Sequence, residues 1–469
     1  MLNIKINGKQ FTANAGEKLS DVLIQNKFAV EHPCGGRGTC KKCRVKINGQ
    51  EVLSCQYVLE SDVEVELDES FGIVSESGVD EGANNTDNLC LALDIGTTTL
   101  ALALVSLDDK KAVKVITATN PQRAFGADVI TRIDYCQKNS VSELQAVLID
   151  EINSMISKMN CPHIDMMYVS GNTTMLHIFF GVDCSSIGVA PYTPVFIDER
   201  RENAVDIGIL GVGEVISLGG VSSFVGADIV AGINYIGLPE GDDYYLLCDL
   251  GTNAEVVLFS KNGGVATAAA AGPCFEGANI SCGMSATKGA IYAFEMNGNG
   301  EAKFKTIMDA KATGICGTGL IDIISQLVRA EIIDETGYME QDEFVFDDGV
   351  YLSAADVRQY QLAKSAVCSA ILVLMSVLGV EFDQISKLYI SGGFSAKINV
   401  KNAVESGLLP KELQEKTVAI NNSSLLGTIK FACENGKMST DSSSIKYIDL
   451  SSNKDFADLF IENMMFEII

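Results

Sequence analysis

The feature that most constrains the fold of this chain is a faint internal duplication. Residues 91–104 read LALDIGTTTLALAL and residues 246–259 read LLCDLGTNAEVVLF, so that Asp, Gly and Thr coincide. A second pair follows, with MYVSGNTTM around Gly171 and LYISGGFSA around Gly392. Each copy predicts a strand, an Asp-x-Gly turn and a strand, then a helix, a strand, a glycine turn and a helix. The repeat therefore predicts two α/β lobes that face one cleft.

Composition limits the classes of protein to which the chain can belong. Its 469 residues are 47% hydrophobic and 20% charged, which is typical of a folded protein of two or three domains. Sixty-one acidic against 35 basic residues give a net charge of −26, so we expect neither nucleic acid nor membrane as a partner. The N-terminus MLNIKINGKQFT has no signal core, which predicts a cytoplasmic protein. The apolar run 366–380 is too short for a bilayer and predicts a buried helix.

The chain is expected to divide into a small module, a linker and two lobes. Residues 1–68 read as a β-rich module, because apolar residues alternate and Asn7-Gly8 and Asn48-Gly49 are hairpin signals. Ser20 is a candidate helix cap in this module. Residues 69–88 read as an acidic flexible linker. Residues 89–240 form the first expected lobe and residues 241–469 the second.

Four cysteines of the first module have the spacing of a metal site. They follow a C-x5-C-x2-C-x11-C pattern and are Cys34, Cys40, Cys43 and Cys55. Four thiolates can hold a 2Fe-2S cluster, and the plant-type pattern differs by one residue in its first gap. The alternative, a structural zinc site, usually has two C-x2-C pairs, whereas this loop has one. The pattern therefore predicts a 2Fe-2S cluster on these cysteines.

Other cysteines and histidines are weaker candidates. Cys274, Cys282 and Cys316 lie in glycine-rich segments, where a second cluster or close packing of small side chains would both account for them. His163 and His177 have no second histidine nearby and are interpreted as structural, with a role as partner-facing ligands as the alternative.

The two duplicated turns are candidate phosphate sites. In the first, Asp94 precedes Gly96, Thr97 and Thr98, and in the second, Asp249 precedes Gly251, Thr252 and Asn253. Glycine lets the turn approach a phosphate, the polar side chains and N–H groups bind it, and the aspartate holds Mg²⁺ through water. Asp94 and Asp249 are thus the candidate catalytic residues, with Asp94 as the Mg²⁺ ligand through water.

Two further glycine turns are candidate nucleotide contacts. Gly392 and Gly393 join a strand to a helix, which lets the backbone pass close to an adenosine. Gly317, in GICGTGLID, opens an apolar helix and is a candidate phosphate or ribose contact. The Gly317 turn lacks the lysine of a P-loop, so no Walker-type site is implied there.

These turns, in this order, resemble those of the actin, sugar-kinase and seventy-kilodalton heat-shock ATPase superfamily. The resemblance implies a duplicated, two-lobed actin-like (ribonuclease H-like) fold, with phosphate sites at Asp94 and Asp249 and an adenosine site at Gly392-Gly393. Segments 225–232 and 424–432 then correspond to the two helices that connect the lobes, and their small residues predict that these helices cross closely.

The whole chain resembles one family, the reductive activators of corrinoid proteins. The residues that carry the resemblance are CGGRGTCKKCRV, LALDIGTTTLALAL, NPQRAFGADVITRI, SGNTTM, CDLGTNAE, AGPCFEGANISCGM, GICGTGLID and ISGGFSA. It implies a β-grasp 2Fe-2S ferredoxin domain before the ATPase lobes, and an ATP-dependent reduction of Co(II) to Co(I) in a corrinoid protein. The implied partners are that corrinoid protein and a low-potential electron donor protein, and a homodimer is one open option for the oligomeric state.

Three other functions are alternatives at this point. An activator of a 2-hydroxyacyl-CoA dehydratase has a similar ATPase but no fused ferredoxin. A redox-sensing small-molecule kinase would release a phosphorylated metabolite. A nucleotide-gated electron-transfer adaptor would bind ATP without turnover.

Overall fold

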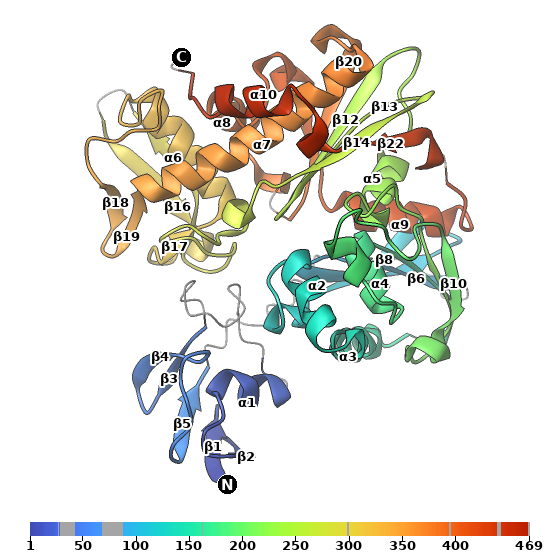
Figure 1. Ribbon diagram of the computed structural model, residues 1–469, viewed down its shortest axis with the longest axis vertical. Coiled ribbons are helices and arrows are strands. Elements are labelled where there is room, and N and C mark those ends of the chain that lie inside the picture. Colours follow the sequence, from blue (N-terminus) through green and yellow to red (C-terminus); the bar gives the residue numbers. More distant parts are fainter. Residues whose placement is uncertain are drawn as a thin grey trace. The chain divides into compact units, whose positions relative to one another are not determined.

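The computed structural model describes residues 1–26, 28, 43–67, 88–161, 163–297, 300–393, 395–438 and 442–467. They divide into two compact units, the first made of 1–228 with 428–437 and the second of 229–427 with 438–469 (Figure 1). Each unit is described by itself below. The linker expected at 69–88 lies outside the described residues except for Asn88, and the domain boundaries expected at 68, 88 and 240 stay predictions.

The N-terminal module of the first unit is a five-stranded sheet with one helix. Its strand order is β2-β1-β5-β3-β4, in which β1 and β5 are parallel neighbours. Positive φ at Asn7, Gly8, Asn48 and Gly49 confirms the two predicted hairpin turns. Ser20 lies inside the helix rather than before it, so its predicted capping role is wrong. The elements are β1 (Leu2–Ile6), β2 (Lys9–Ala13), α1 (Leu19–Gln25), β3 (Arg44–Ile47), β4 (Gln50–Leu53) and β5 (Val63–Glu66).

A six-stranded mixed sheet forms the rest of the first unit. Its order is β10-β11-β9-β6-β7-β8, with β6, β7 and β8 as an antiparallel meander and β9 parallel to β6. The strands are β6 (Leu89–Ile95), β7 (Thr99–Ser106), β8 (Lys111–Thr119), β9 (Ile164–Gly171), β10 (Arg200–Asn203) and β11 (Val212–Ser217). The helices are α2 (Val129–Lys138), α3 (Val141–Met159) and α4 (Thr173–Phe179).

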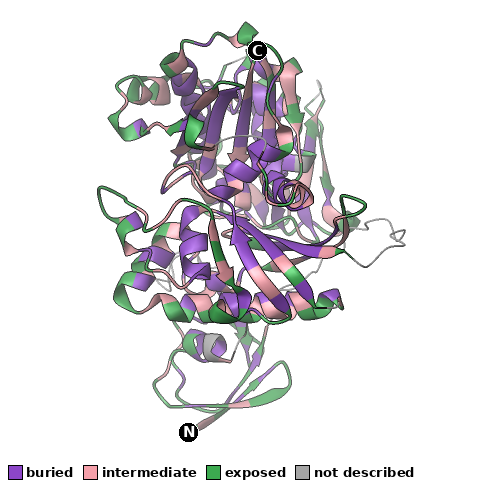
Figure 2. Cartoon of the chain, turned by 90° about the vertical axis from the view of Figure 1, so that its right-hand side faces the viewer, coloured by how far each residue is buried: buried purple, intermediate pink, exposed green. Residues whose placement is uncertain are grey.

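The second unit repeats this plan. Its sheet has the order β21-β20-β12-β13-β14-β22, with β12, β13 and β14 as the meander and β20 parallel to β12. The strands are β12 (Tyr244–Leu250), β13 (Ala254–Ser260), β14 (Gly263–Ala269), β20 (Ile385–Ser391), β21 (Thr417–Ala419) and β22 (Ile445–Tyr447). The predicted duplication is therefore confirmed for five strands of each sheet, whereas β10 and β22 are added at opposite edges. In both units buried residues lie along the inner strands of the sheets and on the helices of the core (Figure 2).

The second unit also contains elements without a counterpart in the first. They are β15 (Ala290–Met296), β16 (Ala302–Thr306), β17 (Gly314–Ile315), α6 (Gly317–Arg329), β18 (Glu343–Asp347), β19 (Val350–Ser353) and α10 (Phe456–Glu462). By contrast, α7 (Ala354–Leu378) and α8 (Val400–Glu405) precede and follow β20 as α3 and α4 precede and follow β9. Helix α7 packs against β13 and β14 and contains the predicted buried helix. It is long and apolar enough to cross a membrane, but 72% of its most apolar window is buried inside the protein, as in a core helix.

The two predicted connecting helices are α5 (Ala227–Ile236) and α9 (Ser423–Cys433). The chain passes between the units at 228/229 inside α5, at 427/428 inside α9, and again at 437/438. The two helices approach closely at Gly427, where an added Cβ would lie 1.7 Å from the carbonyl oxygen of Ala231. The Asn234 side chain also donates to the Gly427 carbonyl at 3.2 Å. The close crossing expected from the small residues is thus confirmed.

Candidate functional site

Two of the four predicted cluster cysteines lie among the described residues. Cys43 precedes β3 and Cys55 follows β4, so the hairpin brings their sulfurs within 3.2 Å of each other. Both side chains are buried, at 1% exposure. A tetrahedral metal with bonds of about 2.3 Å holds its sulfur ligands about 3.8 Å apart, so one iron would fit this pair with a small adjustment. Cys34 and Cys40 lie outside the described residues.

The first phosphate loop follows β6 in the first unit. Asp94 lies near the carboxyl end of this strand and is 7% exposed. The N–H of Gly96 donates to the carbonyl of Thr99 at 3.0 Å, and an added Cβ on Gly96 would lie 2.5 Å from that oxygen. The turn is therefore too tight for a side chain at Gly96, and the close approach of an anion there stays a prediction.

Three successive carbonyl groups of this loop accept hydrogen bonds from the interior of the unit. Asn120 donates to the Gly96 carbonyl with its side chain at 2.8 Å and to the Thr98 carbonyl with its backbone at 2.9 Å. The Arg132 guanidinium donates to the Thr97 carbonyl at 2.6 Å. Carbonyl oxygens would repel a phosphate, so bonding all three to donors makes the loop compatible with an anion.

Arg132 is the most unusual of these supports, because its side chain is fully buried. Besides Thr97, it donates to the Gly126 carbonyl and to Gln122, each at 3.0 Å. A buried cation is tolerated when its donors are satisfied in this way. In the sequence, the segment NPQRAFGADVITRI contributes only to the family resemblance, and neither Asn120 nor Arg132 has a predicted role.

The second phosphate loop follows β12 in the second unit. Asp249 is half-buried and pairs with Ser391 of the parallel strand β20. The N–H of Gly251 donates to the Asn253 carbonyl at 3.0 Å. The Thr252 hydroxyl donates to the Glu276 carboxylate at 2.7 Å. Glu276, in the segment AGPCFEGANISCGM, is thus a further candidate site residue to which the sequence gave no role.

The structure brings the predicted adenosine turn next to this second loop. Gly392 has φ +115°, and an added Cβ would lie 2.2 Å from the Leu250 carbonyl oxygen, so only glycine fits there. Gly393 is exposed and has no atom within 4 Å of an added Cβ. Asp249, Gly392 and Gly393 therefore lie together in one unit.

Gly317 begins α6, where an added Cβ would lie 2.1 Å from the carbonyl oxygen of Phe275. An added Cβ on Gly319 would lie equally close to the Ile291 carbonyl oxygen. Both glycines are buried, so close backbone packing explains them. A nucleotide contact at Gly317 stays a prediction.

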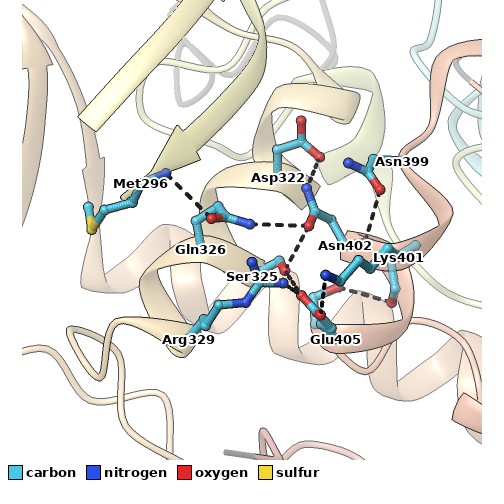
Figure 3. Close-up of polar contacts among 11 residues, drawn as sticks. Met296, Asp322, Ser325, Gln326, Arg329, Asn399, Lys401, Asn402 and Glu405 are labelled. Carbon is cyan, nitrogen blue, oxygen red and sulfur yellow. Dashed lines mark hydrogen bonds and ion pairs between the residues drawn. The ribbon is translucent and has the colours of Figure 1, made fainter. Parts of the chain in front are cut away.

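Helix α6 is also joined to α8, the helix that follows the Gly392 turn, by a buried polar network (Figure 3). The Asn402 amide donates to Asp322 at 2.6 Å and accepts from Gln326 at 3.2 Å. An ion pair joins Arg329 to Glu405 at the end of the network. Burial raises the pKa of Asp322, although the Asn402 bond opposes this shift. The network therefore joins α6 to α8 within the second unit.

The weaker cysteine and histidine candidates have separate surroundings. Cys274 is buried, which raises its pKa to about 12, and the Cys316 thiol donates to the Ile291 carbonyl. The Cys282 thiol forms hydrogen bonds with backbone groups of the β18–β19 hairpin. Within the described part of the chain, no group of three or more His, Cys, Asp or Glu side chains could hold a metal. His177 is fully buried, in agreement with a structural role.

Comparisons with known proteins agree with this geometry. Residues 243–468 match the sequence model of the C-terminal ASKHA domain of RACo, residues 89–240 match the RACo middle region, and residues 4–69 match the 2Fe-2S iron-sulfur cluster binding domain. The corrinoid activation enzyme RamQ of Eubacterium limosum is 27% identical over 417 residues, which cover 80% of this chain and 70% of that protein. A methylated amine-specific corrinoid protein reductase of Methanosarcina barkeri is 24% identical over 382 residues, covering 71% of this chain and 68% of that one.

A solved structure described as a reductive activator for corrinoid, iron-sulfur protein superposes with a TM-score of 0.72 at 26% identity. The superposition covers 99% of this chain and 98% of that one. The matched domains account for the N-terminal sheet with its paired cysteines and for the duplicated sheets with their phosphate loops. The chain therefore belongs to the family of reductive activators of corrinoid proteins, in which a 2Fe-2S ferredoxin domain precedes an actin-like domain.

Proposed function

We propose that this protein is an ATP-dependent reductive activator that returns a corrinoid protein from Co(II) to Co(I). One electron passes from a low-potential donor protein to the ferredoxin domain and from there to cobalt, which is the substrate. The observation that carries the proposal is the presence, in one chain, of a buried thiol pair at Cys43 and Cys55 and of two hydrogen-bonded turns that are candidate phosphate sites. The reduced thiols that such a site requires favour a cytoplasmic location.

The cluster, when bound, supplies a one-electron carrier, and the residues of the chain set its surroundings. Cys43 and Cys55 would hold one iron, and Cys34 and Cys40 the other. The buried position of Cys43 and Cys55 keeps water from that side of the site. For about every 59 mV by which electron transfer to cobalt is uphill, its equilibrium constant falls tenfold. An uphill step without help from ATP would therefore reduce little of the cobalt.

ATP bound by the protein is proposed to supply the free energy that an uphill electron transfer to cobalt requires. In the first unit, Asp94 would hold Mg²⁺ through water beside the Gly96 turn, which would approach a phosphate. In the second unit, Asp249 would act as a further catalytic carboxylate beside the Gly251 turn. Hydrolysis yields ADP and phosphate. ATP shifts the equilibrium only through different affinities for two states of the complex, such as states before and after cobalt reduction.

Anaerobic visible spectroscopy tests the proposal. The intact protein is mixed with a Co(II) corrinoid protein from the same source, a low-potential reductant and Mg²⁺, with or without ATP. We expect the Co(I) spectrum with ATP only, and its loss in Cys43→Ser but not in Cys161→Ser, which changes a cysteine outside the site. An unchanged cobalt spectrum while ATP is consumed would contradict the proposal, as would a phosphorylated small-molecule product.

A further inference from the structure

The backbone of Glu276, beside the second phosphate loop, is held by close contacts on both sides. Glu276 is the last residue of a single 3-10 turn, Pro273–Glu276. An added Cβ on Gly317 would lie 2.1 Å from the carbonyl oxygen of Phe275, so the start of α6 packs directly on the residue before Glu276. The residue after it, Gly277, has φ +79°, and an added Cβ there would meet the backbone of a neighbouring segment at 2.4 Å. These contacts fix the position from which the Glu276 side chain extends.

The carboxylate of Glu276 determines the direction of the Thr252 hydroxyl. The hydroxyl oxygen lies 2.7 Å from a carboxylate oxygen of Glu276. A carboxylate only accepts hydrogen bonds, so the hydroxyl hydrogen of Thr252 points toward Glu276. Toward any other group the Thr252 oxygen then presents its lone pairs, which accept from water and repel a phosphate oxygen. Both side chains are half-buried, so solvent reaches them.

The equivalent threonine of the first loop has the opposite arrangement. The oxygen of Thr97 accepts from the side-chain amide of Asn172 at 3.0 Å. An amide NH₂ group only donates, so this bond uses a lone pair of Thr97 and leaves its hydrogen for an acceptor. The two threonines are therefore suited to different ligands. Thr97 is suited to a phosphate oxygen, and Thr252 is suited to a water molecule.

We propose that Thr252 and Glu276 form a proton relay for the water molecule that hydrolyses ATP, in which Glu276 is a positioning residue that acts through Thr252. This inference rests on the proposed function and deepens it. The water oxygen bonds to the γ-phosphorus while the bond from that phosphorus to the bridging oxygen breaks, and ADP leaves with that electron pair. A water proton passes to the Thr252 oxygen as the Thr252 hydroxyl proton passes to Glu276. Glu276 then releases its proton to solvent, so the step needs no other reactant.

Glu276→Gln distinguishes a relay from a purely structural hydrogen bond. The glutamine carbonyl still accepts from the Thr252 hydroxyl, but it takes up no proton. Phosphate release from ATP is measured anaerobically on the intact holoprotein with Mg²⁺, alone and with the Co(II) corrinoid protein. We expect a kcat at least about 100-fold lower, with a KM for ATP within about twofold of the wild type. Glu343→Gln makes the same change at an exposed position of β18 and should leave both constants unchanged.

The hydroxyl of Thr252 provides a second, independent test. Thr252→Ser keeps the hydroxyl, and we expect it to retain most of the wild-type kcat. Thr252→Val removes the hydroxyl and should lower kcat about as much as Glu276→Gln does. The double variant of Thr252→Val and Glu276→Gln should be no slower than either single variant, because members of one relay fail as a unit. Urea unfolding of each variant confirms that the rates are measured on folded protein.

The outcomes separate this inference from the function on which it rests. If Glu276→Gln hydrolyses ATP as the wild type does, the bond to Thr252 is structural, and the inference fails while the proposed function stands. If Glu276→Gln instead raises the KM for ATP or the Mg²⁺ concentration that gives half the maximal rate, Glu276 binds nucleotide or metal, and the relay is overturned. If the wild type releases no phosphate with ATP and the Co(II) corrinoid protein, the proposed function fails and the inference fails with it.

Discussion

The Asp94 loop of the first unit and the Asp249 loop of the second follow equivalent strands but have different supports. Each aspartate lies near the end of the first strand of a meander and pairs with a serine of the adjacent parallel strand, Ser170 or Ser391. Behind the first loop lies a buried cation, Arg132, bonded to the loop backbone. Beside the second loop, Glu276 binds a threonine hydroxyl.

The difference shows that duplication preserved the backbone plan more strictly than the side chains behind it. The first loop is supported by side-chain donors that reach its carbonyl groups. The second is supported by close backbone contact, since Gly392 touches Leu250. Loops with the same outline should therefore respond differently to substitution.

The largest expected effect is on stability, from Arg132→Ala. Removing this fully buried side chain leaves the carbonyls of Thr97 and Gly126 without the donors that now reach them. Each such loss costs about 1–3 kcal/mol, so we expect about 3–5 kcal/mol less stability in urea unfolding of the holoprotein. Arg201→Ala, which removes an exposed ion pair with Glu214, should cost less than about 1 kcal/mol. Equal effects of the two substitutions would show that Arg132 does not support the first loop.

The next effect is on ATP hydrolysis. Asp94→Asn removes the proposed Mg²⁺ contact and Asp249→Asn the second proposed catalytic carboxylate, and we expect at least about a 100-fold loss of rate for each, or about 2.7 kcal/mol. The loss should be larger at Asp94, because that carboxylate is more deeply buried. Phosphate release is the measurement, with Asp165→Asn at an exposed position as control. Wild-type turnover in either variant would remove that loop from the site.

The sequence predicted the parts of the site that depend on local backbone chemistry. Asp94, Asp249 and Gly392 stand in short motifs in which residue type and spacing carry the signal, and the small residues of α5 and α9 revealed their crossing. Arg132 and Glu276 were missed because their roles depend on contacts with distant segments. Arg132 is 35 residues from Thr97, and nothing in its own helix pattern marks it as buried.

Two equivalent glycines give the third comparison. An added Cβ would lie 2.2 Å from the Leu250 carbonyl oxygen at Gly392 but 2.9 Å from the Ile95 carbonyl oxygen at Gly171. Gly392 also has φ +115°, which other residues rarely adopt. We expect Gly392→Ala to cost about 2–3 kcal/mol in urea unfolding and to weaken ATP binding, and Gly171→Ala to cost less. The reverse order would mean that the first loop, not the second, depends on close backbone contact.

The smallest effect compares the two threonines that follow the turn glycines. The Thr252 hydroxyl donates to a carboxylate, Glu276, whereas the Thr97 hydroxyl accepts from the neutral amide of Asn172. Bonds to a charged group contribute about 1.5–3 kcal/mol and neutral ones about 0.5–1.5, so Thr252→Val should lower stability more than Thr97→Val. Urea midpoints measure both, with Thr252→Ser and Thr97→Ser retaining each hydroxyl. If Thr97→Val proved the more costly, the hydroxyl of Thr97 would be as essential to the first loop as the Arg132 bond to the Thr97 carbonyl. Side-chain support would then extend to the whole turn.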